Sequence, residues 1–158
     1  SIKVKPLVNF FLEEEQNLDK VLDIFIRINS GGTKLEYSDL LLSMATAKWK
    51  KIDAREAVTE LLDELNDIGN ENGFNFTKDF ILQTCLVLCD IKDVTFNLKN
   101  FNESNMKIIE KNFGKIEKAL LLSVKLVSEF GYDKNRLSSN NAIIPITYFF
   151  FKCFVLVK

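Results

Sequence analysis

Apolar residues recur every three or four positions along most of this chain, which is the spacing of helices that bury one face. A first stripe covers Leu18–Ile28 and ends just before the glycine pair at 31–32. The segments 35–49 and 54–68 continue the pattern, and the second has the most regular apolar face in the chain. Asp53 stands directly before that face and is a favourable N-cap residue. The pattern therefore predicts a series of helices joined by short turns.

The segment Phe80–Leu88 is apolar nearly all round, which is typical of a helix enclosed on every side. Thr77 is a suitable N-cap for it. We expect this helix at the centre of a bundle, with Cys85, Cys89 and the third cysteine as free, buried thiols. A loop is predicted for 92–102. That loop contains a short alternating run that is typical of extended chain: Val94, Phe96 and Leu98.

A long amphipathic helix is predicted to begin at Asn102 or Ser104 and to run to Phe130. Gly131 follows it in the position where a helix commonly ends with a left-handed residue. Its inward-facing residues are expected to be Ile116, Leu120, Val124 and Val127. The last helix is predicted to begin near Asn141.

The segment Ala142–Val157 is so apolar that a membrane helix has to be considered. A spanning helix needs about 20 apolar residues, whereas this run has 16 and contains Pro145 and Lys152. We therefore predict a packed helix and no membrane contact. Its unbroken apolar surface indicates contacts on several sides, some of them with other parts of a larger protein.

The segments together predict an all-α protein, an irregular bundle of about five to seven helices. We assign residues 1–17 to an extended lead-in and 18–158 to a single helical domain. The composition is that of a globular protein, with 47% hydrophobic and 27% charged residues.

Charge and residue usage narrow the classes of function. The 21 basic and 22 acidic residues give a net charge of −1, so no overall field attracts the chain to nucleic acid or a membrane. Three cysteines and the lack of a secretory leader predict a reducing cytoplasm. The chain has no histidine, which excludes a Ser-His-Asp triad. Cys85 and Cys89 have a metal-like spacing, but only Cys153 remains as a further thiol ligand. No catalytic residue and no metal site are predicted.

A polar turn with two adjacent glycines is the strongest candidate for binding chemistry. Its residues are Arg27, Asn29, Ser30, Gly31, Gly32 and Thr33. In one interpretation the Arg27 guanidinium and the glycine N–H groups bind phosphate oxygens. In the other interpretation the turn is a structural corner, in which the glycines supply positive φ and Asn29 hydrogen-bonds the backbone. The spacing leaves both open.

The same stretch resembles the GmrSD-type restriction-endonuclease N-terminal domain family, also called domain of unknown function 262. The family signature F-x-R-x-N-x-G-G-x-x-L is matched by Phe25, Arg27, Asn29, Gly31, Gly32 and Leu35. A second, softer match covers Arg136–Pro145. The resemblance implies the helical second part of a nucleotide-dependent, anti-phage protein similar to type IV restriction enzymes. It also implies that Arg27 and Asn29 form a wall of a nucleotide pocket.

The chain departs from this family in two ways. It lacks the upstream Asp-Gly-Gln-Gln-Arg motif that hydrolyses NTP, and it lacks the histidine of the downstream nuclease domain. The chain begins at Ser1 and ends in an apolar run, and we interpret it as a piece that is inactive alone. The resemblance implies that the remaining domains of the parent protein are its partners. Those domains would bind NTP with Mg²⁺ and would contact DNA, whereas this piece itself would hold no cofactor.

A basic cluster with a tryptophan inside it offers another function. Lys48, Lys50 and Lys51 can contact a nucleic-acid backbone while Trp49 stacks on a base. Alternatively, the cluster is a helix C-terminus whose cations complement the helix dipole while Trp49 packs inward. Two non-catalytic classes therefore stand beside the restriction-type protein, namely a protein-interaction bundle and a DNA-contacting helical module.

Overall fold

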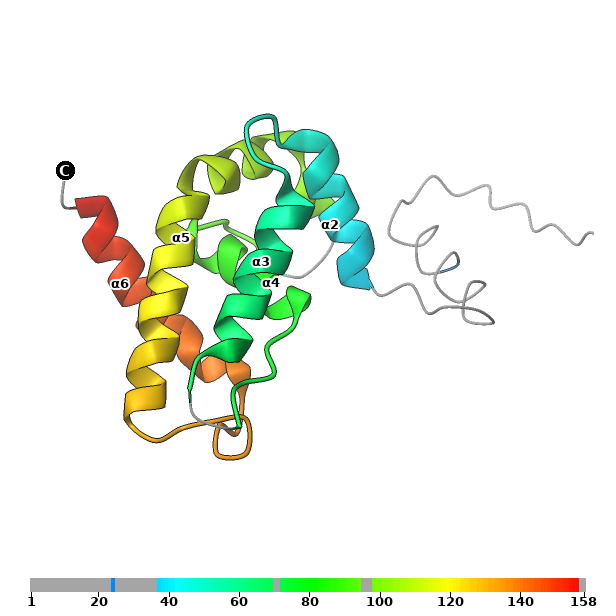
Figure 1. Ribbon diagram of the computed structural model, residues 1–158. Coiled ribbons are helices and arrows are strands. Elements are labelled where there is room, and N and C mark those ends of the chain that lie inside the picture. Colours follow the sequence, from blue (N-terminus) through cyan, green and yellow to red (C-terminus); the bar gives the residue numbers. More distant parts are fainter. Residues whose placement is uncertain (1–23, 25–36, 70–71, 95–97, 157–158) are drawn as a thin grey trace, which may run out of the picture. The chain divides into compact units, whose positions relative to one another are not determined.

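A computed structural model describes residues 24, 37–69, 72–94 and 98–156 of the chain (Figure 1). The chain divides into two units, residues 1–35 and 36–158, and the second unit is described here by itself. The predicted lead-in, and the first helix apart from the helical Ile24, lie outside the described residues. The predicted boundary between 17 and 18 therefore stays a prediction.

The second unit is an irregular bundle of helices, and no strand occurs in the ranges just given. The α-helices are α2 (Tyr37–Lys48), α3 (Ala54–Asp67), α4 (Lys78–Leu88), α5 (Glu103–Glu129) and α6 (Ile144–Leu156). Two 3-10 helices, η2 (Leu98–Phe101) and η3 (Asn140–Ile143), precede α5 and α6. The prediction of an all-α bundle is confirmed.

Side-chain caps start three of the helices where the sequence predicts them. The Asp53 carboxylate accepts hydrogen bonds from the Arg55 and Glu56 N–H groups at 2.8 and 3.2 Å. The Asn102 side chain accepts one from the Asn105 N–H group at 2.9 Å. Thr77 caps α4 in the same way. Each cap satisfies an N–H group that has no partner within its helix.

Helix α4 occupies the centre of the bundle, as its apolar sequence predicts. It packs against α2, α3, α5 and α6. Most of its side chains are buried, namely Phe80, Ile81, Leu82, Thr84, Cys85, Leu86 and Leu88. The predicted inner face of α5 is confirmed too, since Ile116, Leu120, Val124 and Val127 are all buried.

Three details differ from the sequence predictions. Leu98 belongs to the 3-10 helix η2 rather than to extended chain, because the buried Phe101 one turn later anchors that turn in the core. Cys89 is only half-buried and Cys153 is exposed, although all three thiols are free as expected. Cys89 is the C-cap residue that follows α4, and Cys153 lies on the exposed side of α6, and the apolar character of both helices conceals these positions.

Helix α6 packs against α5, crosses it obliquely and emerges at one side of the bundle (Figure 1). It follows η3 directly, and Pro145 falls in its first turn, where a missing N–H group costs no helical hydrogen bond. Its 13 residues span roughly 20 Å at 1.5 Å per residue. None of the helices in the described part of the chain has the length and apolarity needed to cross a membrane.

Candidate functional site

The turn from Arg27 to Thr33 lies outside the described residues. Both interpretations of it, the phosphate cradle and the structural corner, therefore stay predictions. The other candidates fall inside the bundle.

The basic cluster Lys48–Lys51 is held against α5 and η2 at the C-terminus of α2. The Lys48 ammonium donates a hydrogen bond to the Phe101 carbonyl oxygen at 2.6 Å. The backbone N–H groups of Lys50 and Lys51 both donate to one carboxylate oxygen of Glu110, at 2.7 and 2.6 Å. These N–H donors, that of Lys51 first, hold the pKa of Glu110 below its usual value. These contacts hold the cluster in place, and of its four residues Lys50 and Lys51 are exposed.

Trp49 points into the core and not toward solvent. Its side chain is 7% exposed, and its ring meets the Phe113 ring edge-on with the centroids 5.1 Å apart. Stacking of Trp49 on a base would require the side chain to leave this packing. The arrangement favours the interpretation in which the lysines complement the helix dipole and Trp49 packs inward.

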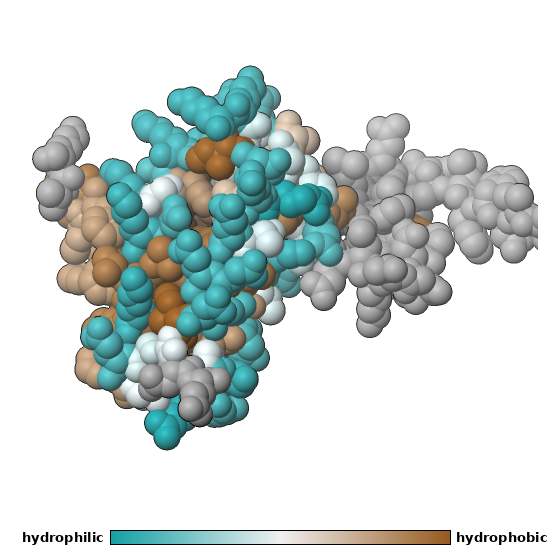
Figure 2. Space-filling model, viewed as in Figure 1, coloured by the Kyte–Doolittle hydropathy of each residue, from teal (hydrophilic) through white to brown (hydrophobic). Residues whose placement is uncertain are grey.

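Helix α6 presents the apolar surface that its sequence predicts, and the structure shows which residues form the exposed part of it. Four residues on one side of it are exposed and uncharged, at the spacing of a helical face: Pro145, Phe149, Cys153 and Leu156. We call this set the α6 stripe. Phe149 is 65% exposed and Leu156 is 80% exposed, whereas Phe151 on the opposite side is 3% exposed. In Figure 2 tan and brown atoms mark α6 at the left of the molecule, in contrast to the teal surface of α3.

A polar cluster borders the α6 stripe on the side of α4. The Tyr148 hydroxyl donates to one Asp90 carboxylate oxygen at 2.8 Å, and the Lys152 ammonium forms an ion pair with the other. The ammonium also lies 4.8 Å from the centroid of the Tyr148 ring. The hydrogen bond from Lys152 is the largest cause of a lowered pKa of Asp90. Lys152, the one charged residue of α6, is thereby neutralised.

Asp90 adopts a left-handed backbone conformation, with φ +53°, directly after α4. This conformation is uncommon for residues other than glycine, although Asp and Asn tolerate it better than most. It places the carboxylate at the end of α4 and next to α6. The contacts of this one side chain with Tyr148 and Lys152 therefore link the two helices.

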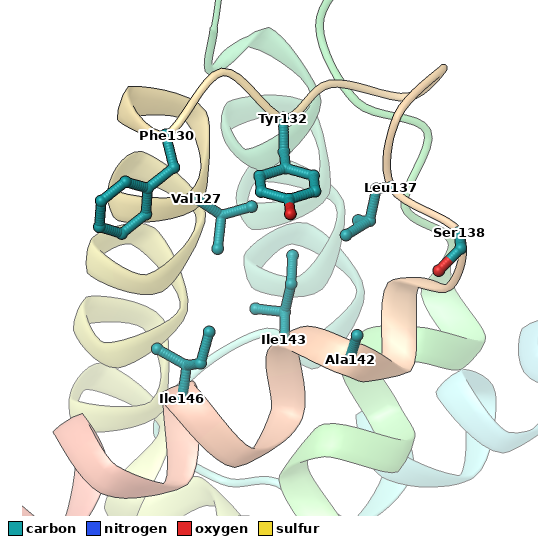
Figure 3. Close-up of a pocket in the computed structure, with 8 residues that line it drawn as sticks. All are labelled: Val127, Phe130, Tyr132, Leu137, Ser138, Ala142, Ile143 and Ile146. Atoms are coloured by element: carbon teal, nitrogen blue, oxygen red, sulfur yellow. The ribbon is translucent and has the colours of Figure 1, made fainter.

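An apolar cavity of about 320 Å³ lies beside the N-terminal end of the α6 stripe (Figure 3). Its lining comes from the end of α5, the loop after it, η3 and the first turn of α6: Val127, Phe130, Tyr132, Leu137, Ser138, Ala142, Ile143 and Ile146. In Figure 3 the Tyr132 ring lies above Ile143, whereas the Phe130 ring points away from the other lining residues. The volume is at the lower end of the range for small-molecule pockets.

The loop over this cavity runs from Phe130 to Ser139, and its last part, from Arg136 onward, belongs to the second match, Arg136–Pro145. Its fold depends on Gly131, whose φ of +83° favours glycine. The Arg136 guanidinium donates to the Gly131 carbonyl oxygen at 2.9 Å, and the Asp133 carboxylate accepts from the Asn135 and Arg136 N–H groups. The second match therefore forms one wall of the cavity, with Arg136 in a structural contact.

No protein-family model matches this chain, and no curated protein sequence matches it. Within the described ranges, no three His, Cys, Asp or Glu side chains gather as ligands for a metal ion. Sequence analysis predicted an apolar surface on this last helix but did not identify the residues of the α6 stripe, the Asp90 cluster or the cavity. The one signal that pointed toward them is the apolar character of α6 on every side.

Proposed function

We propose that this chain is the helical, non-catalytic assembly portion of a nucleotide-dependent restriction-type protein of the GmrSD kind. The observation that carries the assembly role is the α6 stripe. The signature from Phe25 to Leu35 supports the choice of parent protein.

The α6 stripe supports an assembly role because it places two large, exposed apolar side chains, Phe149 and Leu156, on one helical face. Single apolar residues are common on protein surfaces, whereas a continuous apolar face flanked by polar groups is characteristic of interfaces. Interface centres are poor in charge and rich in aromatic side chains. Phe149 occupies the middle of the stripe, and the neutralised Lys152 borders it.

The resemblance implies the chemistry of the parent protein. Its upstream part would hydrolyse NTP with Mg²⁺, and a nuclease part would cleave foreign DNA. In this proposal Arg27 contributes a bidentate charge-assisted contact to the nucleotide. The helical bundle joins the catalytic parts of the parent protein.

A DNA-contacting role for Lys48–Lys51 is the alternative, and it has less support. Trp49, the residue that would stack on a base, is buried against Phe113. The two exposed lysines alone offer a weak electrostatic contact.

The non-catalytic role is tested on the chain alone. Phosphate release from ATP and GTP, and nicking of a supercoiled plasmid, are measured with Mg²⁺ or Mn²⁺. We expect rates equal to those of a buffer blank. Turnover clearly above the blank would show that the chain carries its own catalytic site and would overturn this part of the proposal.

The nucleotide role of the signature turn is tested in the full-length protein. Arg27→Lys keeps the charge but loses the bidentate geometry, so nucleotide affinity should fall while the melting temperature stays unchanged. The structural-corner interpretation expects the reverse: Gly31→Val and Asn29→Ala lower the melting temperature, and Arg27→Lys leaves affinity unchanged. Unchanged affinity in a folded Arg27→Lys variant would refute the nucleotide pocket.

A further inference from the structure

We infer that the α6 stripe binds the same stripe of a second copy of this chain, antiparallel and across a two-fold axis at Phe149. This inference rests on the proposed assembly role and names its partner. Three features of the described residues support it: the charge of the surface, the positions along α6, and the cavity at one end of the stripe.

The charge of the stripe favours self-association. A two-fold interface places each patch against its own copy, so an unpaired charge would meet a like charge. Pro145, Phe149, Cys153 and Leu156 are uncharged. Lys152 on the border is already paired with Asp90 of its own chain. The surface can therefore meet itself without like-charge repulsion.

The positions along the helix suit an antiparallel pair. Leu156 lies seven residues after Phe149 in α6, roughly 10 Å along the helix, and Ala142 lies on the other side of Phe149 in η3, which leads directly into α6. An antiparallel arrangement places Leu156 of one copy opposite Ala142 of the other. The two Phe149 rings meet at the axis, where aromatic pairs add to the stability of an interface.

The cavity offers a place for the leucine. Ala142 and Ile146 belong to its lining and lie at the N-terminal end of the stripe. Its volume of about 320 Å³ is ample for a leucine side chain, and most of its lining is apolar (Figure 3). Leu156, the most exposed large apolar side chain among the described residues, would enter the cavity of the second copy. In such a dimer each copy would insert its Leu156 side chain into the cavity of the other copy, which gives the two identical contacts of an isologous interface.

Sedimentation over a wide range of protein concentration tests the association. We expect a concentration-dependent dimer for the unmodified chain and monomers for Phe149→Ser and Leu156→Ser. Leu122→Ser is the matched control, because Leu122 is an exposed leucine on α5 outside the stripe. It should dimerise like the unmodified chain. A monomer at every concentration, or a dimer that survives both stripe substitutions, would overturn the inference.

Cross-linking tests the register. In the antiparallel pair the two Cys153 residues lie roughly 12 Å apart, which is beyond the reach of a disulfide. Pro145 of one copy lies opposite Cys153 of the other in this register, so Pro145→Cys, which keeps the Phe149 ring, should form a disulfide-linked dimer under mild oxidation. Efficient linkage between the two Cys153 residues of the unmodified chain would indicate a parallel pair and contradict the register.

A charge pair tests the contact between Leu156 and the cavity mouth. Ala142→Lys and Leu156→Glu should each weaken the dimer, and the double variant should recover part of the affinity because the new charges meet across the interface. Failure of the double variant to recover would refute the contact. A monomeric chain without turnover would overturn only this inference, whereas turnover by the chain would contradict the proposed function instead.

Discussion

Helices α4 and α6 are similar in composition but differ in how much of their surface is covered. Both are short and apolar nearly all round. In α4 most side chains are buried, whereas α6 buries only Thr147 and Phe151 of its 13 residues. Helix α4 has neighbours on every side, and α6 packs mainly against α5 and α4 at the edge of the bundle.

The difference shows that apolar composition does not by itself determine burial. An apolar helix at the centre is covered by its own chain, and an apolar helix at the edge keeps a surface that another molecule can cover. The free energy that α6 can gain from burial is therefore only partly realised within one copy. Each prediction below tests this difference, beginning with the largest expected effect.

The reactivity of the thiols should differ most. Cys153 in α6 is exposed, whereas Cys85 in α4 is fully buried, and burial raises the pKa of the Cys85 thiol. Modification of Cys85 requires the bundle to open, so Cys153 should react faster by more than about 10³-fold. Mass spectrometry of the native protein over time measures both rates. Similar rates for the two would show that α4 is not enclosed.

The half-buried Cys89 should react at an intermediate rate. Burial raises its pKa to about 12, so little thiolate is present near neutral pH.

In a dimer, Cys153 should also react more slowly as protein concentration rises, because the second copy covers it.

A new charge should destabilise the protein far more when it is placed in α4 than when it is placed in α6. Leu86→Asp places an unpaired charge at a fully buried position of α4 and should cost roughly 3–5 kcal/mol of the free energy of unfolding. Leu156→Asp introduces the same change at an exposed position of α6 and should stay within about 0.5 kcal/mol. Denaturant unfolding at a low, monomeric concentration measures both. Equal losses would mean that α6 is enclosed as well.

Two phenylalanines of α6 provide a comparison within one helix. Phe151 is buried and Phe149 is exposed. Phe151→Ala should cost about 3–5 kcal/mol because it leaves a cavity, whereas Phe149→Ala should change the free energy of unfolding by less than about 0.5 kcal/mol in the monomer. The same denaturant experiment distinguishes them. A large loss for Phe149→Ala would place its ring inside the bundle.

The sequence predicted the features that depend on neighbours along the chain. The caps Asp53, Thr77 and Asn102 and the left-handed Gly131 follow from local hydrogen bonds and backbone preferences, and all are observed. The central place of α4 agrees with the prediction from its apolar sequence, although α6 shows that such a sequence does not by itself require a covered position.

The features that depend on distant contacts were not predictable. Nothing in the periodicity of α6 distinguishes Phe149 from Phe151, since either could face the core. The exposure of Cys153 and the 3-10 turn at Leu98 depend on which helices lie nearby. The Asp90 cluster joins residues about 60 positions apart, and neither segment contains a pattern that predicts its contact with the other.

The smallest predicted effect concerns the Asp90 cluster, which ties the edge helix α6 to the central helix α4. Asp90→Asn retains a residue that tolerates the left-handed conformation and removes the charge. Because the Asp90 side chain is largely exposed and the pair is screened by solvent, the loss near neutral pH should be only about 0.2–1 kcal/mol. Denaturant unfolding of both proteins, again as monomers, measures the difference.

The dependence on pH identifies the ion pair as the cause of that loss. The pKa of Asp90 is lower in the folded state, so its contribution is present above the unfolded value of about 4 and disappears as pH falls through the folded value. The pKa of Lys152 is raised, chiefly by its hydrogen bond to Asp90, so its contribution is present below the unfolded value of about 10.4 and disappears as pH rises through the folded value. The difference between the original chain and Asp90→Asn should therefore be constant between about pH 5 and 10 and shrink outside that window. A difference that persisted at low pH would show that Asp90 acts through its backbone conformation, and that α6 is held to α4 by apolar packing alone.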